Sequence, residues 1–179
     1  MVVTLGIAAL WGSAEATLFF IVPDVCLTWV ALSDLPLALR ASVAAVTGAV
    51  AGGVVMYAWG RRQPERAAAV VAMVPGISRG LIVQVEHDLR TRGWFPMFVG
   101  SITAVPYKIY AIKSGTLGRS VPAFVVMSAC ARAIRFVALA SVTSAISNAL
   151  PDGPLVYRRM ALLGVWAIVY VTYARTRGR

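Results

Sequence analysis

The stretch that decides the fold is GSAEATLFFIVPDVCL, residues 12–27. Most of its residues are apolar, which suits a membrane interior, yet it contains two carboxylates, Glu15 and Asp24, with Pro23 directly before the second. A proline inside a helix removes a backbone hydrogen bond and clashes with the preceding turn. The stretch therefore predicts a broken helix that carries acidic groups at a depth where charges are rare.

The composition predicts an integral membrane protein. Of the 179 residues, 59% are hydrophobic and only 13% are charged, whereas ordinary soluble domains have about 25% charged residues. Mean hydropathy is +0.77. The length indicates one domain. The start of the sequence has no basic segment ahead of its apolar residues, so we do not interpret it as a signal peptide.

The formal net charge of +10 has a simple interpretation in a membrane protein. The basic residues lie mostly between apolar runs, which is typical of cytoplasmic loops next to anionic lipid and not of a nucleic-acid-binding surface. Cys26 and Cys130 have no metal or redox spacing, so we expect small buried hydrophobic residues. The single histidine, His87, is expected on a solvated loop or helix face. We expect no metal and no cofactor.

Three segments are long and apolar enough to span a membrane, which takes about 20 residues. They are residues 41–60, 120–147 and 154–174. The first has no charge, and Gly48, Gly52 and the preceding Ala44 form a face of small residues that predicts close helix packing. The second and third each have a proline at the start, where a helix tolerates it.

Other apolar segments are too short or too interrupted to span. Residues 2–12 and 94–107 are short, and residues 16–32 are interrupted, so these predict re-entrant or broken helices. The sequence leaves open whether residues 2–12 cross the membrane. Residues 61–93 have charges around an apolar centre that a Pro-Gly pair breaks. They predict amphipathic helices at the membrane interface, with a soluble helical hairpin as the alternative.

The two halves of the chain share an order of features. Each has an apolar segment, a proline beside a charge, a polar turn and a long helix, with Pro23 in the first half and Pro106 in the second. Paired interrupted segments of this kind indicate a transporter built as an inverted repeat. The predicted fold is therefore an all-α membrane domain with two opposed re-entrant hairpins. Its parts are a first repeat (1–60), an amphipathic segment (61–93), a second repeat (94–150) and a C-terminal span (154–174), together one domain over residues 1–179.

Basic residues set the expected orientation. They are concentrated in residues 61–93 and in the tail, at Arg175, Arg177 and Arg179, whereas the opposite side has few. The positive-inside rule then places residues 61–93 and the C-terminus in the cytoplasm. With this orientation the two broken segments enter from opposite faces of the membrane.

Six ionisable residues lie within or at the edge of apolar segments: Glu15, Asp24, Lys108, Lys113, Arg132 and Arg135. A charge at mid-membrane costs ~2.5–3.5 kcal/mol on insertion scales. Arg132 and Arg135 share a helix face, because they are three residues apart. They need acidic partners or an anionic ligand, and the only acids at similar depth are the two in residues 12–27. The charges are interpreted either as ion pairs that hold broken segments together or as a polar path across the membrane.

Four stretches in order resemble the DedA superfamily, also called the VTT or SNARE-associated domain. They are a glutamate before FFIVPD, the glycine-rich GAVAGGVVMYAWGRR, the stretch GWFPMFVGSITAVPYKIYAIKSG, and ACARAIRFVA. The segment VPYKIYAIKSG is similar to the YqaA-like branch. Many members have two arginines around the second proline. Here Thr103 stands at the first arginine position, and Lys108 lies close to the second.

The resemblance implies a multi-pass protein of a bacterial or archaeal cytoplasmic membrane. Members of the family are implicated in moving phospholipids or undecaprenyl phosphate between leaflets, and proton coupling through embedded acids has been proposed for them. From the charges themselves we expect Lys108, Arg132 and Arg135 to bind a phosphate headgroup by charge-assisted hydrogen bonds, and Glu15 and Asp24 to balance these cations or to take up protons.

The predicted function is transbilayer movement, by a flippase or scramblase, of a phosphate-bearing lipid such as undecaprenyl phosphate or a phospholipid. The alternatives are a proton-coupled transporter of a small ion or solute, and a membrane scaffold without transport. We do not expect an enzyme, because no nucleophile–base set or metal cluster is evident. The headgroup, the energy coupling and the formation of a homo-oligomer stay open.

Overall fold

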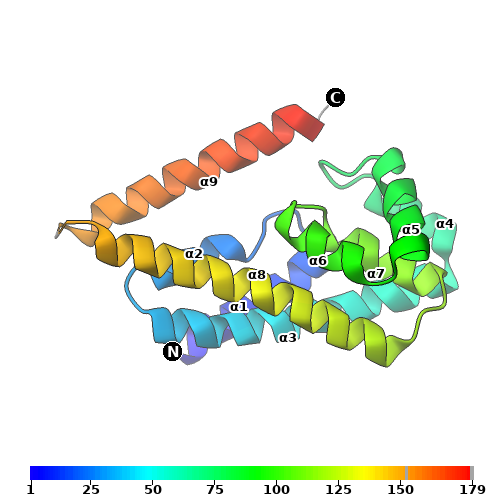
Figure 1. Ribbon diagram of the computed structural model, residues 1–179, viewed down its shortest axis with the longest axis horizontal. Coiled ribbons are helices and arrows are strands. Elements are labelled where there is room, and N and C mark those ends of the chain that lie inside the picture. Colours follow the sequence, from blue (N-terminus) through cyan, green and yellow to red (C-terminus); the bar gives the residue numbers. More distant parts are fainter. Residues whose placement is uncertain (152, 178–179) are drawn as a thin grey trace.

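The computed structural model describes residues 1–151 and 153–177. Residues 152, 178 and 179, which belong to the turn before the third span and to the basic tail, lie outside the described residues. Within the described ranges all regular structure is helical, as predicted. The helices are α1 (Val2–Ala16), α2 (Asp24–Ala31), α3 (Leu35–Arg62), α4 (Pro64–Val71), α5 (Arg79–Arg92), α6 (Phe95–Ile102), α7 (Tyr107–Thr116), α8 (Val121–Ala149) and α9 (Leu155–Arg177) (Figure 1).

Three of these helices, α3, α8 and α9, are long and apolar enough to cross a membrane. This confirms the three predicted spans and a membrane-embedded, multi-pass chain. The start of the first span was predicted too late, because α3 begins at Leu35 and not at residue 41. The side chain of Asp34 accepts a hydrogen bond from the backbone N–H of Leu37 at 2.8 Å, and Pro36 lies in the first turn. Both features favour a helix start at this point.

Helices α1 and α3 pack with their backbones in close contact along the face of small residues. A Cβ atom on Gly48 would lie 1.9 Å from the carbonyl oxygen of Ala9, and one on Gly12 would lie 2.2 Å from that of Ala45. A Cβ on Gly52 would lie 2.6 Å from the carbonyl oxygen of Ser13. The small residues therefore have the packing role that the sequence predicts, and they hold α1, which ends beside Glu15, against a full span.

Two apolar segments are each broken into a pair of shorter helices, at the places that the prolines predicted. Residues 17–23 separate α1 from α2, and residues 103–106 separate α6 from α7. Pro23 and Pro106 each directly precede the second helix of their pair, so they mark true ends of helices and not kinks. In the second break, Ala104 adopts a left-handed conformation with φ of 57°, which costs an L-residue about 1–2 kcal/mol.

Helices α4 and α5 form the expected pair in the basic segment, with the loop 72–78 between them. They pack on α7 rather than standing apart. The ammonium of Lys113 in α7 lies 2.7 Å from a carboxylate oxygen of Glu86 in α5, and that carboxylate also binds Arg90 at 2.8 Å. The guanidinium of Arg119 binds the carbonyl of Leu89. His87 is exposed on the outer face of α5, as predicted.

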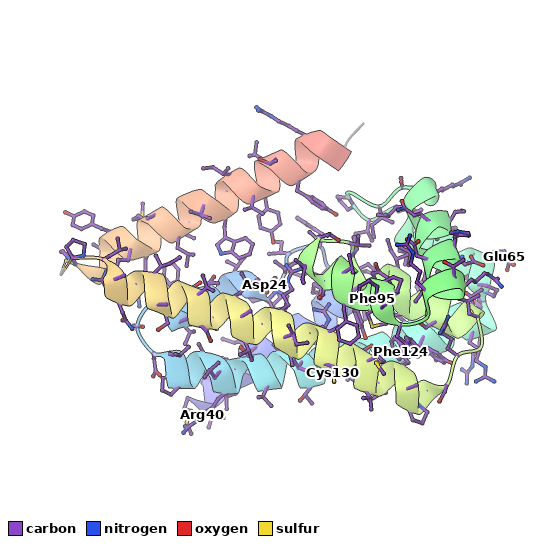
Figure 2. The ribbon with its side chains drawn as sticks, in the orientation of Figure 1. Asp24, Arg40, Glu65, Phe95, Phe124 and Cys130 are labelled. Atoms are coloured by element: carbon purple, nitrogen blue, oxygen red, sulfur yellow. The ribbon has the colours of Figure 1, made fainter. Side chains whose placement is uncertain are left out.

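The prediction that both cysteines are buried was wrong for Cys130, which is exposed on α8, and Cys26 is half-buried. Figure 2 places Cys130 at the outer side of α8, whereas Asp24 lies in the middle of the molecule. In a bilayer the outward face of a span is as apolar as the inward face. Apolar neighbours in the sequence therefore do not indicate which way a residue faces.

Helix α9 is less buried than the other two long helices, α3 and α8. After the turn that follows α8 it diverges from that helix, and its C-terminal end lies toward α4 and α5 (Figure 1). No residue of its most apolar window is buried, and large side chains such as Ile168 are 68% exposed. Its outward face is thus suited to contact lipid tails.

The α1–α3 packing predicts that one added methyl group at the contact destabilises the protein. Gly48→Ala should lower the free energy of unfolding by about 1–3 kcal/mol, because the new Cβ overlaps the backbone of α1. Gly164→Ala in α9 is the matched control, since a Cβ there meets nothing within 4 Å. Thermal unfolding of both variants in detergent measures the difference, and equal stability of the two would contradict the packing.

The attachment of α5 to α7 predicts a dependence on acid. The hydrogen bond from Lys113, and then that from Arg90, lowers the pKa of Glu86 below its ordinary value of 4.5. The stabilisation is therefore complete above pH 4.5 and is lost as the pH falls through the lowered pKa. The melting temperature of Glu86→Gln should be below that of the wild type by a constant amount from neutral pH to pH 4.5. The gap should shrink below that pH, and a gap that widens in acid would contradict this origin.

Candidate functional site

All five predicted site residues line one cavity in the middle of the molecule. Its walls come from both helix breaks, the middle of α8, the inner face of α9 and the loop 72–78. The cavity encloses about 120 Å³, enough for several water molecules. Its charged lining residues are Glu15, Asp24, Lys108, Arg132 and Arg135.

The deepest ion pair joins α8 to α1. The guanidinium of Arg132 donates a hydrogen bond to the carboxylate of Glu15, and the two residues are only 6% and 5% exposed. The same guanidinium lies 4.3 Å from the centre of the Tyr107 ring, at the start of α7. A cation over an aromatic face is stabilised by the ring quadrupole. Arg132 therefore contacts both broken segments, at the end of α1 and at the start of α7.

The second ion pair joins α8 to α2 and α6. The guanidinium of Arg135 donates to one carboxylate oxygen of Asp24 through Nε at 3.1 Å and Nη2 at 2.6 Å. Its Nη1 donates to the carbonyl of Ser101, at the end of α6, at 2.5 Å. The other carboxylate oxygen of Asp24 is buried without a hydrogen-bond partner among the described residues. Asp24 is also the first residue of α2, where the helix dipole favours negative charge.

Lys108 connects the two breaks directly. Its ammonium donates to the carbonyl of Phe19 at 2.9 Å, across from α7 to the first break, and the residue is 2% exposed. The carbonyl of Phe19 belongs to a segment that has no helix to satisfy it. Such backbone groups are tolerated in a membrane only beside protein or water.

The sequence also predicted Lys113 among the charges in apolar segments, but Lys113 does not reach the cavity. Its partner is Glu86 in the amphipathic segment. Lys113 therefore secures α5 and is not a cation of the site.

Sequence reasoning missed the aromatic wall that α9 contributes. The hydroxyl of Tyr170 accepts a hydrogen bond from the backbone N–H of Val22 at 3.0 Å, in the first break. The indole N–H of Trp166 donates to the hydroxyl of Thr28 at 3.0 Å. Trp166, Tyr170 and Tyr173 recur at intervals of four and three residues and all line the cavity. That spacing on one helix face is the signal from which the wall could be predicted.

The chemistry of this cavity suits an anion with several oxygens. It offers two guanidiniums, each paired with a carboxylate, and an ammonium. Groups of these types are able to donate charge-assisted hydrogen bonds to a phosphate. Within the described residues no group of three or more His, Cys, Asp or Glu side chains is placed to hold a metal ion. Comparison with family models, with curated proteins and with solved structures finds no match for this chain.

A double-mutant cycle tests the ion pair between Arg132 and Glu15. Arg132→Gln or Glu15→Gln alone leaves a buried charge without its partner and should cost about 3–5 kcal/mol of unfolding free energy. The double variant removes both charges and should recover most of that loss, with a coupling of at least about 1 kcal/mol. Thermal or denaturant unfolding in detergent provides the values. Arg90→Gln, in an exposed pair, is the control and should cost less than about 1 kcal/mol. Purely additive losses would mean that the pair is not formed.

Proposed function

We propose that the chain moves a phosphate-bearing lipid between the two leaflets of a membrane, as a flippase or scramblase. The observation that supports this is one cavity that is lined by all five charged site residues and has the aromatic face of α9, a long apolar helix, as a wall. A lipid headgroup needs a polar space through the hydrophobic core, while its chains must stay in contact with apolar surface. The ordered resemblance to the DedA superfamily supports the same class.

In this proposal the two broken helix pairs, α1–α2 and α6–α7, are re-entrant hairpins related as an inverted repeat. The break in each pair lies at the cavity, which is where transporters of this type bind substrate. The headgroup binds at Lys108, Arg132 and Arg135, and the chains lie along α9. A proton taken up by Glu15 or Asp24 releases its arginine for the phosphate, which gives a simple route to proton coupling.

We propose further that residues 61–93 and the C-terminal end of α9 face the cytoplasm of a bacterial or archaeal cell. They lie toward one end of the molecule (Figure 1), and the 72–78 loop is close to α9, because a Cβ on Gly76 would lie 2.4 Å from the Tyr173 hydroxyl. The exposed arginines at this end, among them Arg61, Arg62, Arg79 and Arg92, suit an anionic membrane surface.

Reconstitution tests the proposal. Liposomes that contain the pure protein should move a labelled phospholipid or undecaprenyl phosphate across the bilayer far faster than empty liposomes. The Glu15→Gln/Arg132→Gln double variant, which has no unpaired buried charge at this position, should lose at least about tenfold of that rate because a charge-assisted phosphate contact is gone.

The outcomes separate the alternatives. Lipid movement at the wild-type rate in the double variant would remove Arg132 and Glu15 from the site. No lipid movement, with flux of a small anion or solute instead, would favour the solute transporter. Neither activity, at several pH values, would favour a scaffold in which the ion pairs serve only to hold the broken helices.

A further inference from the structure

The charges of the cavity do not balance. Its lining has three cations and two carboxylates among the described residues. Each carboxylate forms an ion pair with an arginine, Glu15 with Arg132 and Asp24 with Arg135. Lys108 is the cation left over, and no carboxylate of the described residues lies within the ion-pair distance of 4.0 Å from its ammonium.

Lys108 also has N–H donors to spare for a molecule in the cavity. An ammonium has three N–H donors, and its one hydrogen-bond partner among the described residues is the carbonyl of Phe19. The residue is 2% exposed and lines the cavity. Glu15 attracts Lys108 electrostatically, but its carboxylate is already paired with Arg132. A buried charge that has no ion-pair partner of its own is unfavourable, and an anion that enters beside it reduces that cost.

We propose that Lys108 makes the site selective for lipids whose phosphate headgroup has one net negative charge, over lipids with the same phosphate and no net charge. This rests on the proposed function and specifies its substrate. A singly charged headgroup brings the cavity to neutrality. A zwitterionic headgroup brings its own cation into a cavity that already has an excess of one, and the two cations repel.

The phosphate could come from a lipid or from a soluble ester, and the structure favours the lipid. One wall of the cavity consists of Trp166, Val169 and Tyr170, on a long apolar helix that has no fully buried residue in its most apolar window. A soluble ester would have no use for that apolar wall, whereas a lipid chain would lie against it.

The test uses two lipids that share a phosphodiester and differ in net charge, phosphatidylglycerol and phosphatidylcholine. In liposomes the wild type should move labelled phosphatidylglycerol at least about tenfold faster than labelled phosphatidylcholine. Lys108→Gln should bring the two rates to within about twofold, whereas Lys108→Arg should keep the preference. Lys113→Gln is the matched control. It lies on the same helix with its ammonium paired to Glu86 outside the cavity, so the preference should be unchanged.

Binding provides a readout that does not need transport. Phosphatidylglycerol added to protein in neutral detergent should raise the melting temperature of the wild type and of Lys108→Arg by linkage. Phosphatidylcholine should not, and Lys108→Gln should respond to neither. Without lipid, Lys108→Gln should melt no lower than the wild type, because the glutamine amide still has a donor for Phe19 and a buried charge has been removed.

The results distinguish the two proposals. Equal responses to both lipids, or a preference that survives in Lys108→Gln, would overturn the role of Lys108. A lower melting temperature of lipid-free Lys108→Gln with an unchanged lipid preference would make the lysine structural. If phosphatidylglycerol binds through Lys108 but no lipid crosses the bilayer, the proposed selectivity is supported and the proposed lipid translocation is contradicted. If sn-glycerol 3-phosphate stabilises the protein as much as phosphatidylglycerol does, an anion-binding site is supported, and the proposal that its ligand is a lipid is contradicted.

Discussion

The ion pair between Arg132 and Glu15 is the interaction on which the rest of the molecule depends. A guanidinium in the middle of a membrane span is costly unless an opposite charge lies beside it. Its partner is at the end of α1, a helix too short to span by itself. The pair therefore fixes α8 to α1, while the small-residue face fixes α1 to α3. Two full spans and the first broken segment become one unit.

The breaks and the charges satisfy each other. A break exposes backbone groups that lipid cannot hydrogen-bond, and buried cations need acceptors. Lys108 binds the free carbonyl of Phe19, and Arg135 binds that of Ser101. Trp11 donates to the carbonyl of Ile21 at 2.9 Å in the first break. In this structure the charges close to Pro23 and Pro106 thus belong to the same group of interactions as the breaks, and all of them meet at the cavity.

Much of this could be predicted from the sequence, and the limits have a physical cause. Hydropathy and prolines located the three spans and both breaks, since these signals are local. The rarity of acids at depth indicated that the arginines would meet Glu15 and Asp24, but not which would meet which. The partner of Lys113 could not be predicted, because Glu86 lies in another helix and no local pattern indicates the contact. The exposure of Cys130 could not be predicted either, because a bilayer accepts apolar residues on every face of a helix. Periodicity then no longer distinguishes inside from outside.

Under the proposed function, the same constraint governs how an anion would enter the cavity. A phosphate that took the place of the Glu15 carboxylate at Arg132 would leave that carboxylate buried without its partner, and breaking a buried ion pair is costly. A cavity with fully balanced charges could bind an anion only by creating an excess. The surplus positive charge of Lys108 would instead give a singly charged headgroup a place before any ion pair has opened.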